Sequence, residues 1–276
     1  MSIIHGTQEP NFRPGHLYKY RSFASDCDKQ RLLHIIQANE IYCSSPASFN
    51  DPFDCKVPPV DSYDPAFVRY LIAARSAKTE EEHCEVYRKF VAPRMLKNTE
   101  LKAFRSGLKA HEQKKFECIL RNIQEKVNKS GVISFSINND SILMWAHYAS
   151  SHRGVCLIFS SEKWPDIRES LYPVTYRTTR LPLILNRQNF DAGQLFQAVI
   201  LTKDQGWSYE QEWRVITPKS GPLKFCDQAL VGVILGCNMA DEDKARVRNA
   251  VGGRSHIALY EARVKESCFG LEILKY

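Results

Sequence analysis

Short apolar runs separated by turn-forming residues predict a sheet whose strands come from both ends of the chain. The run Val155-Cys156-Leu157-Ile158-Phe159 contains no polar position, which is typical of a central strand buried on both faces. The predicted strands share alternating or unbroken apolar sequence and cover residues 16–23, 41–45, 131–137, 155–159, 171–177, 207–216, 229–236 and 257–264.

Between these strands, the apolar residues adopt the spacing of helices. Asp26 or Asp28 is predicted to cap the first helix, and Asp64-Pro65 begins another. Residues 61–129 hold three such segments and little strand pattern. We therefore predict an α+β fold: a single domain over residues 1–276, with a mixed, mainly antiparallel sheet and a helical insertion at 61–129.

Charge and cysteine content narrow the class of protein. The net charge of +7 favours an anionic partner, such as a nucleotide or nucleic acid, although the basic residues are spread out and form no long arm. The nine cysteines form no C-x-x-C pair, which favours a reducing, cytoplasmic location. No apolar stretch approaches the length of a membrane span, and the first residues do not resemble a signal peptide. The sequence predicts no oligomeric state.

The segment Trp207-Ser208-Tyr209-Glu210-Gln211-Glu212-Trp213-Arg214 places two carboxylates two residues apart among aromatic residues. On a strand, Glu210, Glu212 and Arg214 share one face, whereas Tyr209, Gln211 and Trp213 share the other. Like charges on one face destabilise a strand unless a cation or a reaction uses them. The alternative is an edge strand whose polar face carries a Glu–Arg pair.

Two N-terminal clusters combine polar groups with aromatic rings. In Tyr18-Lys19-Tyr20-Arg21 the guanidinium can bind phosphate and the tyrosines can stack on a base, or the segment is a surface strand of alternating charge. In Phe49-Asn50-Asp51-Pro52-Phe53-Asp54, Asn50 and Asp51 favour an Asx-turn, which does not itself require the two flanking phenylalanines.

A third cluster, Trp145-Ala146-His147-Tyr148, lies on a predicted short helix. His147 can hydrogen-bond a ribose or base edge, or it can be an ordinary structural histidine. Asp51, Asp54, Glu210, Glu212 and His147 are ligand types suited to Mg²⁺ or Mn²⁺, but none has a diagnostic spacing, so no metal site is predicted. The chain has no P-loop, G-x-G-x-x-G, H-E-x-x-H or G-x-S-x-G motif.

Taken together, four motifs resemble a bacterial family of domain-of-unknown-function proteins. They are Leu17-Tyr18-Lys19-Tyr20-Arg21, Ser44-Ser45-Pro46-x-x-Phe49-Asn50-Asp51-Pro52-Phe53-Asp54, Leu143-Met144-Trp145-Ala146-His147-Tyr148-Ala149 and Trp207-Ser208-Tyr209-Glu210-Gln211-Glu212-Trp213-Arg214. The resemblance implies a cytosolic protein, and some members occur in mobile or defence-related gene neighbourhoods. It implies no established activity.

A weaker likeness is to ADP-ribosyltransferases, many of which use an early Arg, a Ser-x-Ser strand and a late Glu-x-Glu. This chain has Arg21, Ser134-Phe135-Ser136 and Glu210-Gln211-Glu212 in that order, although the helical block intervenes. The likeness implies NAD as substrate, with Arg21 on the pyrophosphate and Ser134 on the nicotinamide ribose. Glu212 would stabilise an oxocarbenium-like transition state. Glu210 would orient or deprotonate the acceptor.

We therefore hypothesise an NAD-dependent ADP-ribosyltransferase or NAD glycohydrolase, acting as a toxin or defence effector. The alternatives are a metal-dependent nuclease, a nucleotide- or nucleic-acid-binding module without catalysis, and a purely structural role for all four clusters. Residues predicted to meet in one cleft are Tyr18, Arg21, Asn50, Asp51, Trp145, His147, Tyr148, Glu210 and Glu212. Ser134 and Ser136 are predicted to contact the cofactor.

Overall fold

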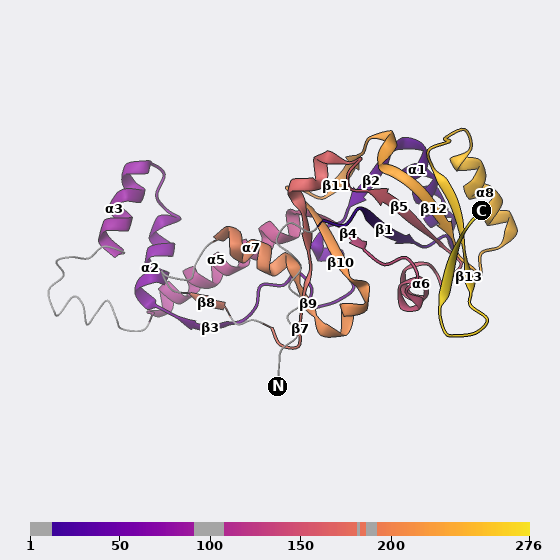
Figure 1. The fold of residues 1–276 in the computed structure, drawn as a ribbon. Coiled ribbons are helices and arrows are strands. Elements are labelled where there is room, and N and C mark those ends of the chain that lie inside the picture. The colour runs from indigo at the N-terminus through magenta and orange to yellow at the C-terminus, as the bar shows by residue number, and fades with distance from the viewer. Residues whose placement is uncertain (1–12, 91–107, 181–182, 186–191) are drawn as a thin grey trace. The chain divides into compact units, whose positions relative to one another are not determined.

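The computed structural model describes residues 13–90, 108–180, 183–185 and 192–276 (Figure 1). The chain divides into two compact units. The sheet unit comprises Met1–Ser45, Gly131–Val174 and Gly206–Tyr276, and the helical unit comprises Pro46–Ser130 and Thr175–Gln205. The predicted helical insertion at 61–129 falls within the helical unit, and the assignment of the whole chain to one domain stays a prediction.

An eight-stranded sheet forms the centre of the sheet unit, in the order β14-β13-β12-β5-β1-β4-β10-β6. Only the β12–β13 pair is parallel among these neighbours, so the predicted α+β fold with a mixed, mainly antiparallel sheet is confirmed. The strands are β1 (His16–Arg21), β4 (Gly131–Ser136), β5 (Val155–Ser160), β6 (Leu171–Pro173), β10 (Glu212–Thr217), β12 (Leu230–Leu235), β13 (Ala258–Val264) and β14 (Leu271–Lys275).

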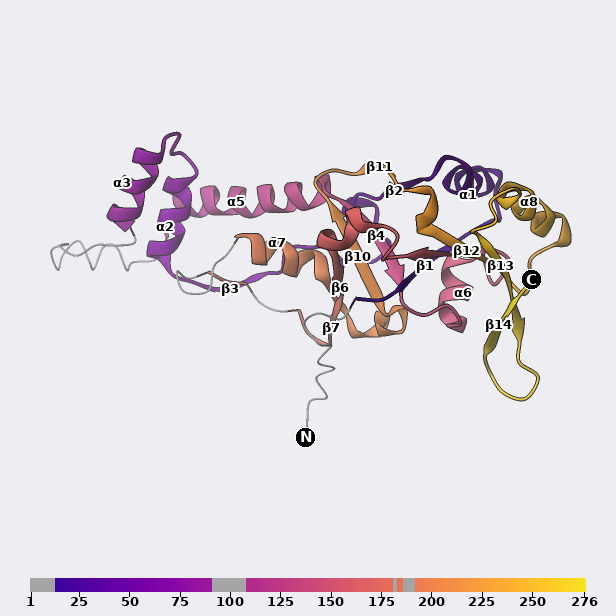
Figure 2. The same cartoon turned by 45° about the horizontal axis from the view of Figure 1, so that its top comes forward.

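Helices cover both faces of this sheet. On one face, α1 (Asp26–Ala38) and α8 (Asp241–Val251) pack their apolar residues against Leu157 and Phe159 of β5. On the other, the short helix α6 (Ile142–Tyr148) packs against Cys156 and Ile158. Figure 2 shows α6 on the side of the sheet opposite to α1 and α8. Because every residue of β5 is buried, the prediction of a central strand here is confirmed.

The first helix begins differently from the prediction. Its N-cap is Ser25, whose hydroxyl accepts a hydrogen bond from the Asp28 amide at 3.1 Å, while the Asp28 carboxylate accepts the Ser25 amide at 3.3 Å. Asp26 lies in the first turn and Asp28 completes a capping box, so neither is the cap itself. The helix ends at Asn39, which takes a left-handed conformation.

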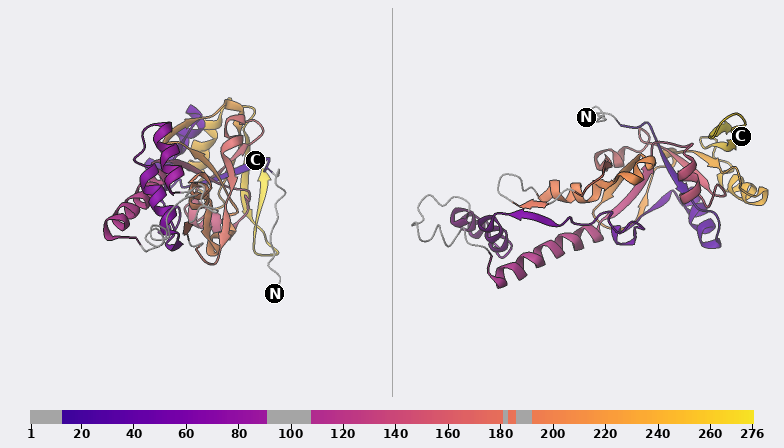
Figure 3. Two further views of the ribbon diagram at one scale, coloured as in Figure 1. Left: turned by 90° about the vertical axis from the view of Figure 1, so that its left-hand side faces the viewer. Right: turned by 90° about the horizontal axis from the view of Figure 1, so that it is seen from below.

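Three of the helices in the helical unit lie where the apolar spacing predicts them, and Asp64 caps the first through the Ala66 amide. The α-helices in the described part of this unit are α2 (Pro65–Ala74), α3 (Glu80–Phe90), α5 (Ala110–Lys129) and α7 (Ala192–Leu201). Phe67, Val68 and Phe116 form its buried core. Helices α5 and α7 lie side by side (Figures 2 and 3). Among the described residues, no helix combines the length and apolarity needed to cross a membrane.

The sequence pattern missed the shorter strands and merged two others. The predicted strand at 171–177 is interrupted at Val174, so that β6 belongs to the main sheet and β7 (Thr175–Arg177) pairs with β9 (Thr202–Asp204). Unpredicted strands of three to five residues are β3 (Val60–Tyr63), β8 (Leu183–Leu185), β9, β11 (Gly221–Lys224) and β14; β11 pairs with β2 (Glu40–Cys43). Such runs are too short to show a period.

Replacing Leu157 by Ala tests the central position of β5. Leu157 is fully buried between Lys19 of β1 and Val233 of β12. We expect the free energy of unfolding, measured by urea denaturation, to fall by about 2–5 kcal/mol because a cavity replaces the side chain. The matched control is Leu143→Ala on α6, where the side chain is 47% exposed. Equal losses for the two variants would contradict the assignment of β5 to the core.

Candidate functional site

Three predicted site residues lie side by side across adjacent strands of the sheet unit. Tyr18 of β1 is opposite Ser136 of β4, and Ser136 is opposite Glu212 of β10. Directly opposed residues project from the same face of a sheet, with their Cβ atoms about 4.5–5.5 Å apart. This row places a phenol, a hydroxyl and a carboxylate next to one another, on the face that α6 covers. Ser134 projects from this face too, opposite Arg214.

Glu212 and Arg214 form a buried ion pair within one strand. Arg214 Nε donates to Glu212 Oε1 at 2.8 Å, and Nη2 donates to Oε2 at 3.0 Å. Arg214 is fully buried and Glu212 is 4% exposed. The two side chains share a face, as predicted from their spacing. Two parallel hydrogen bonds fix the orientation of the Glu212 carboxylate.

Glu210 does not lie on this strand, so the predicted strand at 207–216 is wrong in its first half. Residues Gln205–Glu210 form the 3-10 helix η3, and Gln211 has a φ of 44°, a left-handed conformation that ends the turn. The strand begins at Glu212. Consequently, Tyr209 and Trp213 pack into different clusters on the two faces of the sheet, contrary to the shared face predicted for them.

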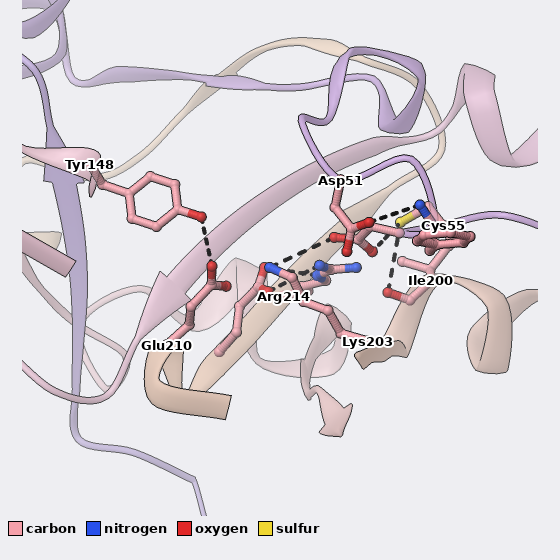
Figure 4. Close-up of polar contacts among 10 residues, drawn as sticks. Asp51, Cys55, Tyr148, Ile200, Lys203, Glu210 and Arg214 are labelled. Carbon is pink, nitrogen blue, oxygen red and sulfur yellow. Dashed lines mark hydrogen bonds and ion pairs between the residues drawn. The ribbon is translucent and has the colours of Figure 1, made fainter. Parts of the chain in front are cut away.

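Glu210 is instead held by Tyr148 of α6. The Tyr148 hydroxyl donates to Glu210 Oε1 at 2.6 Å, and the two side chains point toward each other in Figure 4. Glu210 is 4% exposed. Burial and the carboxylate together raise the pKa of the Tyr148 phenol, so it remains the proton donor of this bond at neutral pH. The structure thus brings Tyr148 and Glu210 together, as predicted. Their contact depends on the 3-10 helix η3 and on α6, not on strand alternation.

Aromatic rings surround this bond. The exposed His147 ring lies 6.2 Å from the Tyr209 ring and 6.5 Å from the Tyr148 ring, measured between centroids. Trp207 extends the group, with its centroid 6.1 Å from that of Tyr209. Solvent therefore reaches the His147 imidazole at the edge of this aromatic group.

Trp145 occupies a different environment from the one predicted for a cofactor contact. It is fully buried, and its indole N–H donates to the Asn139 carbonyl at 2.8 Å. Its ring meets the Tyr20 ring edge-to-face at a centroid distance of 5.3 Å. These contacts make Trp145 part of the core beneath α6 rather than a surface on which a base can stack.

Arg21 does not join the row of Tyr18, Ser136 and Glu212. It is opposite Val155, whose side chain belongs to the core under α1 and α8, so Arg21 projects from the other face of the sheet. Burial and the neighbouring Arg31 lower the pKa of its guanidinium, which Asp28 raises. The expectation that Tyr18 and Arg21 meet in one cleft is therefore corrected, because residues three apart on a strand face opposite ways.

Asn50 and Asp51 belong to the helical unit, in a loop with its own stabilising contacts. Asp51 Oδ1 accepts the Phe53 amide at 2.8 Å, as expected of an Asx-turn, and Asn50 is exposed. The buried Asp54 carboxylate lies 3.8 Å from the Lys203 ammonium. The Cys55 thiol donates to the Ile200 carbonyl (Figure 4).

Within residues 13–90, 108–180, 183–185 and 192–276, no group of three or more His, Cys, Asp or Glu side chains is placed to hold a metal ion. The carboxylates of the nuclease alternative are divided between the units, since Asp51 and Asp54 are in one and Glu210 and Glu212 in the other.

Sequence reasoning missed Lys19, which lies beside the row. Its ammonium donates to the Ser134 carbonyl at 2.7 Å and lies 6.0 Å from the centroid of the Phe135 ring. Burial and then Arg21 lower the pKa of Lys19 to about 7, against the opposing effect of Glu212 and Glu210. One signal could have revealed it: Lys19 stands two residues after Leu17, at a position that strand alternation directs toward the core.

Replacing Arg214 by Ala tests the burial of the ion pair. We expect a loss of about 3–5 kcal/mol in the free energy of unfolding, because Glu212 would stay buried without its cation. Arg263→Ala is the matched control: Arg263 also follows a glutamate, Glu261, by two residues on a strand, but its side chain is 60% exposed. The free energy of unfolding of Arg263→Ala should fall by no more than about 1 kcal/mol. If urea denaturation gave similar losses of unfolding free energy for the two variants, burial would not distinguish the Glu212–Arg214 pair from the Glu261–Arg263 pair.

Comparison with known proteins identifies one related family. Residues 144–215 match the model of a family described as "Protein of unknown function (DUF2971)". Neither the curated proteins nor the solved structures give a match, so the likeness to ADP-ribosyltransferases stays a prediction. The matched segment includes Tyr148, Glu210 and Glu212, and with them most of two of the four motifs. Over residues 144–215, the predicted resemblance to a domain-of-unknown-function family is therefore confirmed, and that family is DUF2971.

Proposed function

We propose that the sheet unit is an NAD-consuming site that cleaves the bond between nicotinamide and ribose, as an ADP-ribosyltransferase or NAD glycohydrolase. The observation that carries this proposal is the row of Tyr18, Ser136 and Glu212 across three adjacent strands. Cleavage of such a bond develops positive charge on the ribose, and a fixed carboxylate stabilises that charge. Arg214 fixes the carboxylate of Glu212.

The neighbouring groups have complementary roles in this proposal. The Ser136 hydroxyl oxygen accepts the Asn138 amide at 3.0 Å, which leaves its own hydrogen free to be donated to a ribose oxygen. Glu210 would orient the acceptor, either water or a nucleophilic side chain, while Tyr148 holds it in place. Because Ser136, Glu210 and Glu212 are all buried, access to them requires movement of the side chains that cover them.

The setting supports a cytoplasmic role as a toxin or defence effector. All nine cysteines are free thiols, as expected of a protein in a reducing compartment. The net charge of +7 suits a dinucleotide that carries phosphates.

The decisive experiment compares NAD consumption by wild-type protein and by Glu212→Gln, with nicotinamide release as the readout. We expect the variant to release nicotinamide at least about 100-fold more slowly, because the amide carries no charge to stabilise the transition state. NAD binding, measured by calorimetry, should change far less. The matched control is Glu261→Gln, which removes a carboxylate paired with Arg263 in the same sheet and should leave the rate unchanged.

Three outcomes decide the proposal. Loss of nicotinamide release in Glu212→Gln alone supports it, provided that both variants unfold at similar temperatures. Failure of the wild-type protein to bind NAD eliminates it. Binding without turnover would favour a nucleotide-binding module, in which the aromatic rings around His147 contact a base.

A further inference from the structure

The junction between β1 and β4 is the weakest backbone contact between neighbouring strands in the centre of the main sheet. β1 pairs with β5 at six positions, from His16 to Arg21, but it pairs with β4 only at Tyr18 and Ser136. That one pair belongs to the row that forms the candidate site. Few backbone hydrogen bonds therefore fix the distance between Tyr18 and the strand that carries Ser136.

Lys19 crosses this junction. Its ammonium donates to the Ser134 carbonyl at 2.7 Å, two residues before Ser136, where a regular sheet would have a backbone N–H of β1. The Phe135 ring, 6.0 Å away, lies beside the ammonium. A hydrogen bond from a charged donor is roughly twice as strong as one between neutral groups, so a single side chain can replace part of the missing backbone pairing.

The charged and titratable groups around Lys19 come from four elements. Arg21 on β1 opposes its charge, whereas Glu212 on β10, Glu210 on η3 and the Cys43 thiol on β2 favour it. Lys19 is therefore a buried cation that interacts with both carboxylates of the candidate site. The charge of Lys19 therefore contributes to the electrostatic potential at Glu210 and Glu212.

We propose that Lys19 is a positioning residue of this site: its ammonium ties β4 to β1 through the Ser134 carbonyl and thereby sets the geometry of Tyr18, Ser136 and Glu212. The effect of Lys19 on catalysis rests on the proposed NAD-cleaving function, whereas its contact with Ser134 does not. Loss of the proton replaces a charge-assisted hydrogen bond with a weaker neutral one. With the pKa of Lys19 at about 7, this change occurs in the physiological range.

The experiment compares the wild-type protein with Lys19→Arg, which keeps the charge at every pH, and Lys19→Met, which removes it. For the wild type, we expect kcat for nicotinamide release to fall roughly three- to tenfold between pH 6 and pH 8.5, with little change in KM. Lys19→Arg should retain the low-pH rate across this range. Lys19→Met should be slow and independent of pH. Lys29→Met is the control, because Lys29 also contacts a phenylalanine ring and one polar partner, but beside α8.

A second readout needs no activity. A lysine whose pKa is about 7 in the folded chain and about 10.4 when unfolded binds one proton fewer when folded, so the free energy of unfolding should rise with pH above 7. On unfolding, we expect the wild type to take up about half a proton more at pH 7, and about one more at pH 8.5, than Lys19→Met or Lys19→Arg. Amides of residues 131–136 should exchange faster in Lys19→Met than in Lys19→Arg.

The two readouts separate the two hypotheses. Suppose that the wild type releases no nicotinamide but shows the expected proton uptake and the expected difference in amide exchange. The NAD-cleaving function is then rejected, and the role of Lys19 in connecting β1 to β4 is supported. If nicotinamide is released and Lys19→Arg loses rate with pH just as the wild type does, the positioning role is overturned and the function stands. Wild-type activity in Lys19→Met, or equal proton uptake in all three proteins, also overturns it.

Discussion

The candidate site depends on the burial of one ion pair inside the sheet. Removing a carboxylate and a guanidinium from water costs several kcal/mol for each ion, by general estimates. The cost is offset when both hydrogen bonds form with good geometry, as they do between Glu212 and Arg214. Because the partners lie two residues apart on one strand, they meet as soon as the strand is extended. The anion is thus fixed by local sequence, and the sheet only has to enclose it.

Strand alternation explains which parts of this arrangement the sequence could predict. It correctly places Glu212 and Arg214 on one face of β10, because both residues lie within one regular strand. It fails at Gln211, whose left-handed conformation is rare for glutamine and leaves no compositional trace. That single residue moves Glu210 off the strand and toward Tyr148.

The clusters rich in aromatic residues were harder to interpret from sequence. Turn chemistry correctly predicts the Asx-turn at Asp51, since it depends only on neighbouring residues. Whether an aromatic ring is buried depends on tertiary packing, so the pattern could not show that Trp145 is in the core while His147, two residues later, is exposed. The face of Arg21 was predictable in principle, because alternation separates it from Tyr18.

The two carboxylates of the site differ in what holds them, and this difference suits them to different work. Glu212 is paired with a cation that cannot lose its proton at physiological pH, which favours a permanently charged group acting through its field. Glu210 accepts a hydrogen bond from the neutral phenol of Tyr148, which holds the carboxylate from the covering helix. An enzyme that cleaves a glycosidic bond needs one group of each kind. In the proposed function, this division of roles comes from an arginine on the same strand and a tyrosine on the covering helix.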